Sequence, residues 1–375
     1  MKKIGQKMGG IKKGWKKTAG VLLAAALLIS TLGGCAGGSD INNNKETAKT
    51  RIFTDSLGRE VEVPEEITSV VSSGNLAQIM LFAAAPDSLM GISGSWSDDA
   101  EEYIDRKYLE LPDVGALFVG HDLNYEEITK LNPQIIIDVG EVKDSLKEDL
   151  DEITDKTGIP AVHISVSIES MGDAFRTLGD LLNQEEQGEK LAEYCEEAYQ
   201  LTEDTMKIVT ENGEKKSLLY CTGENGLNVI AKNSYQSQII DLVSDNLAVL
   251  KNPSAKGTGN EVDMEMLMNW DPEIIIFAPD GYYEYVKEDT VWHSLKAVNA
   301  DTYYEVPNGP YNWMGSPPSS NRVLGMLWMT KLLYPKEADF DLKEKVKEYY
   351  KLFYHCELTD EQYQHLTERS ILKSE

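Results

Sequence analysis

The stretch richest in groups that bind small molecules is GPYNWMGSPPSSNR, residues 309–322. Two aromatic side chains, Tyr311 and Trp313, offer flat apolar area for an aromatic chelator or macrocycle, and tryptophan is also the best cation-π face. Arg322 can meet a carboxylate, a phosphate or an anionic complex. A proline pair stiffens the stretch and so lowers the entropy lost on binding. We therefore predict that residues 309–322, called the 309–322 loop below, line a ligand site.

The residues needed for catalysis are not grouped in this sequence. The five histidines show no HxH, HExxH or CxxC arrangement, and "GTGN" at 257–260 lacks the lysine-serine ending of a Walker loop. No GxSxG elbow is present. We expect a protein that is not an enzyme, with no catalytic residue, no metal site and no cofactor.

The first 34 residues differ in composition from the rest of the chain. They hold seven lysines, no acidic residue and the apolar run "VLLAAALLISTL", which is too short to span a bilayer comfortably and ends in "LGGC". This segment resembles a bacterial lipoprotein signal with its lipobox. The resemblance implies a signal peptide over 1–34, cleaved before a Cys35 that carries diacylglycerol. Residues 35–50 then form a flexible tether.

The charge balance excludes nucleic acid as a partner. The chain has 36 Lys+Arg against 63 Asp+Glu, and removal of residues 1–34 leaves 29 basic residues, so no track of positive charge can neutralise phosphates. The other cysteines, Cys195, Cys221 and Cys356, are widely spaced and odd in number. They fit neither a disulfide framework nor a zinc knuckle, and we interpret them as buried or incidental thiols.

The order of elements predicts an α/β protein of two lobes. A β-hairpin and then alternating strands and helices indicate a Rossmann-like lobe over 51–168, with a parallel-rich sheet. Residues 169–212 show a long helical pattern, interrupted at Gly188, that would link the lobes. The alternation restarts in a second lobe over 213–375, whose last part reads as acidic surface helices. A ligand cleft is expected between the lobes.

The two halves contain a repeated unit. "NYEEITKLNPQIII" at 124–137 aligns with "DMEMLMNWDPEIII" at 263–276 at a constant offset of 139 residues. The alignment matches Glu126 with Glu265, each in the first turn of a helix, where the helix dipole favours an acid. We predict that these two glutamates occupy equivalent places in the two lobes.

The lipobox, the "TDSLGREVEVP" opening, the repeated helix-"NP/DP"-strand unit and the long central helix, in this order, resemble the substrate-binding lipoproteins of ABC importers for iron-siderophores, haem and cobalamin. The likeness covers roughly residues 51–335. It implies two α/β lobes joined by one long helix, with the ligand between them. It also implies one surface glutamate per lobe, here Glu126 and Glu265, docking into arginine pockets of the permease dimer, which works with an ATPase. The protein would be lipid-anchored through Cys35 on the extracytoplasmic side of the cell membrane.

Ligands of open α/β lobes sit beyond the carboxyl ends of strands. This rule and the 309–322 loop together give the predicted ligand-binding residues: Ser73, Asn75, Trp96, Phe118, His121, Tyr282, Tyr283, Tyr311, Trp313 and Arg322. The alternatives are that Arg322 pairs with an acid of its own lobe, that Trp313 is core and that His121 is a plain surface residue.

An aromatic-plus-arginine site ranks an iron complex, above all an iron(III)-siderophore, as the first ligand. Corrinoid or haem comes second, and an oxyanion such as molybdate third, with loop serines and an asparagine as donors. A chelatase-like metal enzyme of related two-lobed architecture is the rival from another class. A surface adhesin or sensor using the same cleft is a further alternative.

Overall fold

The computed structural model describes residues 49–118, 122–213, 215–254, 257–279 and 281–371 of the chain. Residues from Ala48 onward form one compact unit. The predicted signal peptide and almost all of the predicted tether lie outside the described residues. Within the described ranges, no helix has both the length and the apolar character needed to cross a membrane.

The first lobe opens with the predicted hairpin. Strands β1 (Thr50–Thr54) and β2 (Glu60–Pro64) pair antiparallel. The turn between them is fixed by Asp55, whose Oδ1 accepts hydrogen bonds from the backbone N–H groups of Leu57 and Arg59, both at 3.0 Å. A carboxylate that accepts from its own turn in this way stabilises it locally.

The sheet of the first lobe has four strands, all parallel, in the order β4-β3-β5-β6. Their bounds are Leu89–Gly91, Val70–Ser72, Ile135–Gly140 and Ala161–Ser165. Helix α1 (Asn75–Ala84) packs on the face that carries Ile135 and Ile137. Helices α3 (Tyr125–Leu131) and α4 (Leu146–Thr157) pack on the face that carries Ile136. The apolar run of β5 is thus explained by burial on both faces.

The second lobe repeats this arrangement around a mixed sheet. Its order is β10-β8-β7-β11-β12, with β9 also paired to β7. The pairs of β7 with β9 and β11, and of β11 with β12, are parallel, whereas β8 pairs antiparallel with β7 and β10. The bounds are Ser217–Thr222 (β7), Asn228–Val229 (β8), Asp245–Asn246 (β9), Asn260–Glu261 (β10), Ile274–Phe277 (β11) and Tyr303–Glu305 (β12). The predicted two-lobed α/β fold with parallel-rich sheets is confirmed.

Helices of the second lobe cover both faces of this sheet. Their bounds are Gln238–Val243 (α7), Met264–Trp270 (α8), Tyr283–Val286 (α9), Lys296–Asn299 (α10) and Asn321–Leu333 (α11). Residues of α7 and α11 share a core with Ile274 and Ile276 of β11. Residues of α8 and α10 share another core with Ile275 and Phe277.

The predicted linking segment 169–212 contains two helices, α5 (Met171–Leu182) of the first lobe and the long α6 (Glu185–Asn212). The predicted interruption at Gly188 is wrong, because the break falls at Asn183, which adopts the left-handed conformation with φ 55°. Gly188 lies inside α6 and lets the two helices approach closely. A Cβ at this position would lie 2.7 Å from the Phe175 carbonyl oxygen and 2.9 Å from the Gly179 Cα.

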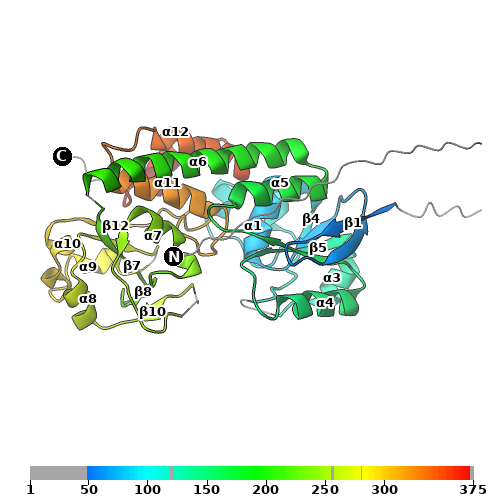
Figure 1. The fold of residues 1–375 in the computed structure, drawn as a ribbon, viewed down its shortest axis with the longest axis horizontal. Helices are drawn as coiled ribbons and strands as arrows, with labels where there is room; N and C mark the ends of the chain where they lie inside the picture. Colours follow the sequence, from blue (N-terminus) through cyan, green and yellow to red (C-terminus); the bar gives the residue numbers. More distant parts are fainter. Residues whose placement is uncertain (1–48, 119–121, 214, 255–256, 280, 372–375) are drawn as a thin grey trace, which may run out of the picture. The chain divides into compact units, whose positions relative to one another are not determined.

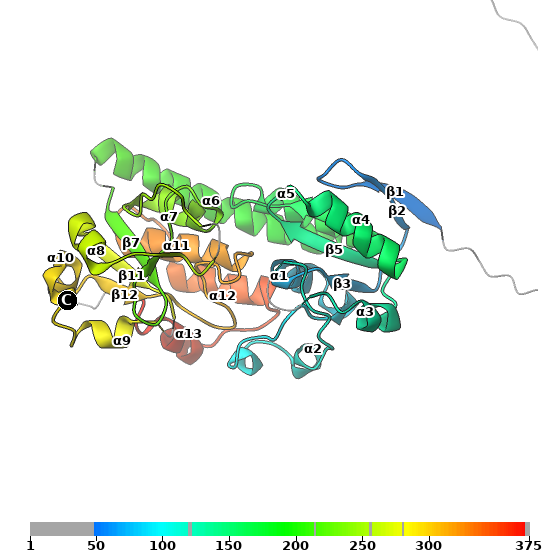
Figure 2. The same cartoon turned by 90° about the horizontal axis from the view of Figure 1, so that it is seen from below.

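Helix α6 contacts both lobes, packing on α1 and α5 of the first and on α7 and α11 of the second, as Figures 1 and 2 show. The C-terminal helices α12 (Leu342–Phe353) and α13 (Asp360–Thr367) were predicted as surface helices. Helix α12 instead buries Val346, Tyr349, Tyr350 and Phe353 against α1, α6 and α11. The charged residues of α12 lie on its other face. The prediction of a surface helix was wrong because it considered the overall composition of α12 and not its apolar face.

The close approach at Gly188 gives a stability prediction. Gly188→Ala should lower the free energy of unfolding by about 1–3 kcal/mol, because the added methyl group meets backbone atoms that cannot turn away. Urea denaturation would measure this. Gly257→Ala is the matched control, since a Cβ there meets nothing within 4 Å, and an equal loss in both variants would contradict the close-packing argument.

Candidate functional site

The 309–322 loop connects β12 with α11 and reaches the first lobe through two hydrogen bonds. Gln78 Nε2 on α1 donates to the Tyr311 hydroxyl at 3.2 Å, and Ser319 Oγ donates to the Leu76 carbonyl at 2.9 Å. Helix α1 follows β3 and the loop follows β12, so both lie beyond the carboxyl ends of strands, as predicted. We call the region of Leu76, Gln78, Tyr311 and Ser319 the lobe junction.

Two predicted site residues from different lobes meet at the lobe junction. The rings of Trp96 and Tyr311 lie with centroids 5.5 Å apart, and Trp96 also packs edge-on against Phe82 at 5.2 Å. Both are buried, with 8% and 7% of their surface exposed. Burial raises the pKa of Tyr311, because the phenolate form would be desolvated. The structure thus brings Trp96 and Tyr311 together in a buried aromatic contact between the two lobes.

Trp313 lies in the core and is fully buried. Its backbone packs directly against Gly325 of α11, and its side chain belongs to the large buried core that residues of both lobes share. The predicted flat ligand-facing surface of Trp313 and Tyr311 is therefore not exposed in this structure. The alternative that Trp313 is core describes its position correctly.

Arg322, the second residue of α11, is also fully buried. Its Nη1 donates to the Tyr235 carbonyl at 3.0 Å and to Gln238 Oε1 at 3.1 Å. The guanidinium carbon lies 4.5 Å from the centroid of the Tyr235 ring. Its Nε and Nη2 atoms are buried without a hydrogen-bond partner among the described residues.

The guanidinium of Arg322 is a cation in an environment of neutral groups. Burial lowers the pKa of Arg322, because desolvation disfavours its charge. An arginine nevertheless stays protonated in proteins. Across the described part of the chain no carboxylate forms an ion pair with Arg322, so the alternative of a partner acid in its own lobe is not found. The buried positive charge of Arg322 can therefore bind an anion.

Ser73 and Asn75 follow the carboxyl end of β3 and differ in their hydrogen bonding. The Ser73 hydroxyl donates to Asp138 Oδ1, and Asp138 Oδ2 lies 2.7 Å from His163 Nδ1. All three members of this chain are buried, so Ser73 is tied into a structural network. Asn75 Oδ1 is buried with no partner within the described ranges, so Asn75 keeps an unused polar atom.

The other predicted ligand residues lie elsewhere. Phe118 is exposed, with Lys143 Nζ 3.5 Å above its ring. The Tyr282 hydroxyl donates to Asp289 Oδ2 at 2.5 Å, and Tyr283 packs against Tyr303. His121 lies outside the described residues. The structure does not bring Phe118, Tyr282 or Tyr283 into contact with Arg322 or Tyr311.

The repeated unit is reproduced in local structure. Asn124 caps α3 by accepting from the Glu127 N–H at 3.0 Å, and Asp263 caps α8 by accepting from the Met266 N–H at 2.8 Å. Both helices have seven residues and end at a left-handed residue, Asn132 and Asp271. Each of these pairs keeps the offset of 139 residues. The two halves therefore share their capping as well as their sequence.

Glu126 and Glu265 both lie in the first turn of these helices and are exposed. Among the described residues no ion pair involves either carboxylate. Glu127, the neighbour of Glu126, is instead paired with Lys130 at 3.1 Å. The two carboxylates of the repeated unit are thus available to a partner molecule.

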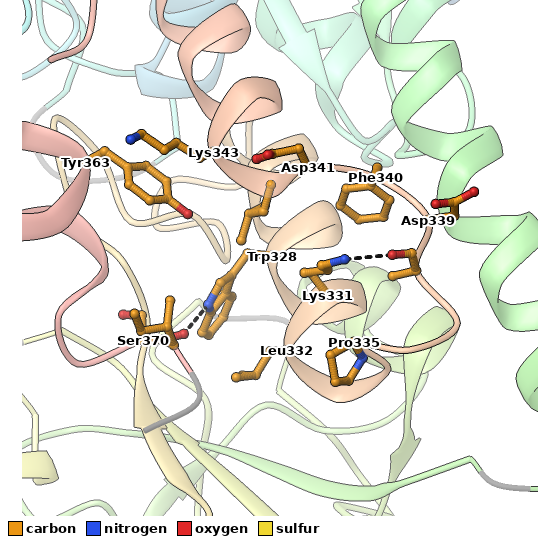
Figure 3. A pocket seen from close by; sticks show the side chains of 13 residues that line it. Trp328, Lys331, Leu332, Pro335, Asp339, Phe340, Asp341, Lys343, Tyr363 and Ser370 are labelled. Atoms are coloured by element: carbon orange, nitrogen blue, oxygen red, sulfur yellow. Dashed lines mark hydrogen bonds between the residues drawn. The ribbon is translucent and has the colours of Figure 1, made fainter. Parts of the chain in front are cut away.

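A pocket of about 580 Å³ is lined by residues of α11, α12 and α13 and their adjoining segments, none of which belongs to the lobe junction; Figure 3 shows its lining side chains. Trp328 Nε1 donates to the Ser370 carbonyl at 2.6 Å, and Lys331 Nζ donates to the Ala338 carbonyl at 2.7 Å. Two of the donors that line the pocket are thus already paired, and no unpartnered buried polar atom of the described residues belongs to its lining. This pocket supports no ligand assignment.

Metal-binding groups are not gathered in the described part of the chain. There, no three His, Cys, Asp or Glu side chains lie close enough together to hold a metal ion. Cys195, Cys221 and Cys356 are free, and the first two are buried, as predicted. Burial raises the pKa of the Cys221 thiol to about 12, which keeps it protonated and unreactive at neutral pH.

Sequence reasoning missed Tyr235 and Gln238, which hold Arg322. They lie in "SYQSQ", where Ser234 and Ser237 form a capping box. That capping pattern indicates a helix start at the carboxyl side of the β7–β8 hairpin. The sequence therefore indicates that a helix begins here, near the strand ends of the second lobe. It gives no sign that Gln238 contacts Arg322, which lies 84 positions later.

Comparison with known proteins gives a consistent result. The sequence profile of the family described as periplasmic binding protein matches residues 70–309. A search of curated proteins found no match. An ABC transporter solute binding protein from Sulfurospirillum deleyianum DSM 6946 is similar in structure, with a TM-score of 0.76 and 27% identity over 85% of this chain and 99% of that one.

Two further solved structures share the fold at lower identity. The molybdate periplasmic binding protein MolA of Haemophilus influenzae, bound to molybdate, has a TM-score of 0.63 and 17% identity over 82% of this chain and 99% of its own. The periplasmic catecholate-siderophore binding protein VctP from Vibrio cholerae has a TM-score of 0.56 and 15% identity over 77% of this chain and 100% of its own. At these identities the likeness concerns the fold alone.

The buried network behind Ser73 gives a second stability prediction. Asp138→Asn should lower the free energy of unfolding by about 1.5–3 kcal/mol, because the hydrogen bonds of Ser73 and His163 to a charged carboxylate are weakened. Chemical denaturation would measure the loss. Asp144→Asn, at an exposed position, is the control and should change little. Equal stability of the two variants would show that the network contributes nothing.

Proposed function

Because this chain belongs to the periplasmic binding protein family, we propose that it captures an iron(III)-siderophore or related iron chelate and delivers it to an ABC importer. The family match and the similar solute-binding proteins support the ABC solute-binding role. Proteins of this kind act in transport and not as enzymes. The identity of the ligand and the residues that hold it are the parts that we propose.

The repeated capped helices are the single observation that carries delivery to a permease. Glu126 and Glu265 are exposed at equivalent helix starts of two separate lobes. A permease dimer offers two equivalent surfaces, and arginines on each can bind a carboxylate through two charge-assisted hydrogen bonds. One glutamate per lobe thus matches one pocket per permease subunit.

We also propose that Cys35 carries a lipid anchor. The argument rests on the "LGGC" sequence after a basic and apolar segment. An anchored protein on the extracytoplasmic face would stay close to its permease, which raises the effective concentration of the two partners.

The geometry of the lobe junction changes the order in which we rank the candidate ligands. Burial of Tyr311 and Trp313 removes the stacking surface that favoured an aromatic chelator or a macrocycle such as haem or a corrinoid. Arg322 favours a ligand with negative charge, because it is a buried cation without an acid partner in the described structure. An anionic iron chelate remains our first candidate, and a molybdate-type oxyanion is the second. We place this ligand near Asn75, Trp96 and Arg322.

The docking proposal predicts a separation of uptake from binding. Glu126→Lys combined with Glu265→Lys should abolish ligand uptake by cells, because two lysines would repel arginine pockets, whereas ligand affinity of the purified protein should stay unchanged. Uptake of labelled ligand and isothermal titration would measure the two quantities.

The matched control combines Glu148→Lys and Glu185→Lys, which reverse exposed first-turn acids of α4 and α6. This control should transport normally. A large loss of affinity in the docking variant, or an equal loss of uptake in the control, would refute the docking assignment.

The ligand proposal predicts a selective response of the tryptophan emission. Trp96 lies at the lobe junction, so an iron(III) chelate that binds there should quench its fluorescence in a saturable way. The full chain would be titrated with ferric siderophores, haem, cobalamin and molybdate at equal ionic strength, and Trp96→Phe should remove most of the change. A response to haem or cobalamin alone would overturn the iron-chelate proposal.

A further inference from the structure

We propose that the Nε–Nη2 edge of Arg322 is a preformed fork that binds two oxygens of one anionic ligand group. The chemical class is a carboxylate or a tetrahedral oxyanion. This inference rests on the proposed solute-binding function and specifies the ligand chemistry of the same site.

The free atoms of Arg322 are the pair that a two-oxygen anion requires. A guanidinium is planar, and Nε–H and one Nη2–H point in parallel from the same edge. This edge matches the spacing of carboxylate or phosphate oxygens and gives two parallel charge-assisted hydrogen bonds. In this structure Nε and Nη2 are the two atoms without a partner among the described residues.

The opposite end of the guanidinium is fixed. Nη1 donates to the Tyr235 carbonyl at 3.0 Å and to Gln238 Oε1 at 3.1 Å. Gly315 packs against the aliphatic part of Arg322, where a Cβ would lie 2.9 Å from Cδ. The orientation of the free edge is therefore set before a ligand arrives, which reduces the cost of ordering it on binding.

The energetics of burial also favour a ligand at this edge. A buried charge with unused donors is costly, and it is retained where a partner compensates it. The partners in the described structure are a carbonyl and an amide oxygen, which are neutral. An anionic ligand group would satisfy both free donors and the charge in one contact.

The surrounding helices add positive potential. Helices α1 and α11 both begin without an acidic residue in the first turn and without a side-chain cap. Ser319, three residues before Arg322, bonds to Leu76 in the first turn of α1, so the two helix starts lie close together. Helix starts favour anions. Burial raises the pKa of Tyr235, and the charge of Glu141 acts in the same direction. Glu141 is exposed and forms no ion pair in the described structure.

Access to the fork requires a local displacement. Tyr235 and Gln238 are half-buried, whereas Arg322 beneath them is fully buried. The Tyr235 ring covers the guanidinium, so we expect this ring to move aside while its backbone carbonyl continues to hold Nη1.

The test follows the Nε–H signal of Arg322 by NMR in the full chain with ¹⁵N-labelled arginine. The chain has only six arginines, and the buried one is recognised by slow exchange of its Nε–H with solvent. The probes are molybdate, phosphate, sulfate, citrate and ferric citrate at equal ionic strength. A saturable shift of this one signal is the expected result.

Variants provide an independent measurement of affinity. Arg322→Lys keeps the charge but loses the fork, so affinity for the probe that shifts the signal should fall at least about tenfold, the lower end expected for charge-assisted hydrogen bonds. Arg106→Lys is the matched control, since Arg106 is exposed and, among the described residues, its one ion pair is with Glu110, four positions later. If Arg322→Lys fails to fold, the NMR titration of the unchanged chain still decides.

The outcomes distinguish a free oxyanion from the carboxylate of a chelate. They also distinguish failure of the fork proposal from failure of the solute-binding proposal. A shift with molybdate, phosphate or sulfate supports a free oxyanion, and a shift with citrate or ferric citrate alone supports a carboxylate of a chelate. Binding of a ligand without a shift of the Arg322 signal overturns the fork while leaving the solute-binding function intact. Absence of a shift with every probe, while cells take up an iron chelate, also overturns it.

Discussion

The two sheets share no strand, so the helices that contact both lobes determine where the lobes stand. Helix α6 packs on α1 and α5 at one end and on α7 and α11 at the other. Its contact with α5 is close because Gly179 and Gly188 face each other, and helices without side chains at a contact approach most closely. The lobe junction, the buried aromatic pair and the position of Arg322 all depend on this frame. Helix α12 reinforces it by packing on α1 and α6 together.

A rigid frame explains how the chain tolerates a buried guanidinium. Two hydrogen bonds to Nη1 and one aromatic ring offset only part of the desolvation cost of Arg322. The remaining cost lowers stability, and an apolar residue of similar size would avoid it. A site that is used for binding gives a reason for keeping the charge, since the ligand then provides the compensation that the protein lacks. The large apolar core, which includes Trp313, stabilises the fold against this cost.

Much of the fold could be predicted because strand and helix patterns are local. The hairpin, the alternation of elements and the repeated unit with Glu126 and Glu265 are set by residues near each other in sequence. The cleft residues were harder to predict, because burial depends on contacts between distant segments. Trp313 is of the residue type that stacks on ligands, yet its side chain is fully buried in the core. Arg322 was predicted from its type and from its place after a strand, but its partners Tyr235 and Gln238 lie 87 and 84 residues earlier, where no local pattern indicates the contact. The buried face of α12 was hidden by its high charge.

The positions of the two glutamates bear on the proposed docking to a permease. Helix α3 ends at Leu131 and β5 begins at Ile135, so the end of the helix lies at the start of the strand. The helix runs antiparallel to the strand, and its start therefore lies at the edge where β5 ends. The same relation holds for α8 and β11, with Trp270 and Ile274 as the connecting ends. Both glutamates thus lie on the carboxyl edges of their sheets, the edges that also face the proposed ligand site. A permease that holds both glutamates would meet the protein on the side from which a bound anion can leave. Any change in the spacing of the two lobes on docking would act directly on the junction beside Arg322.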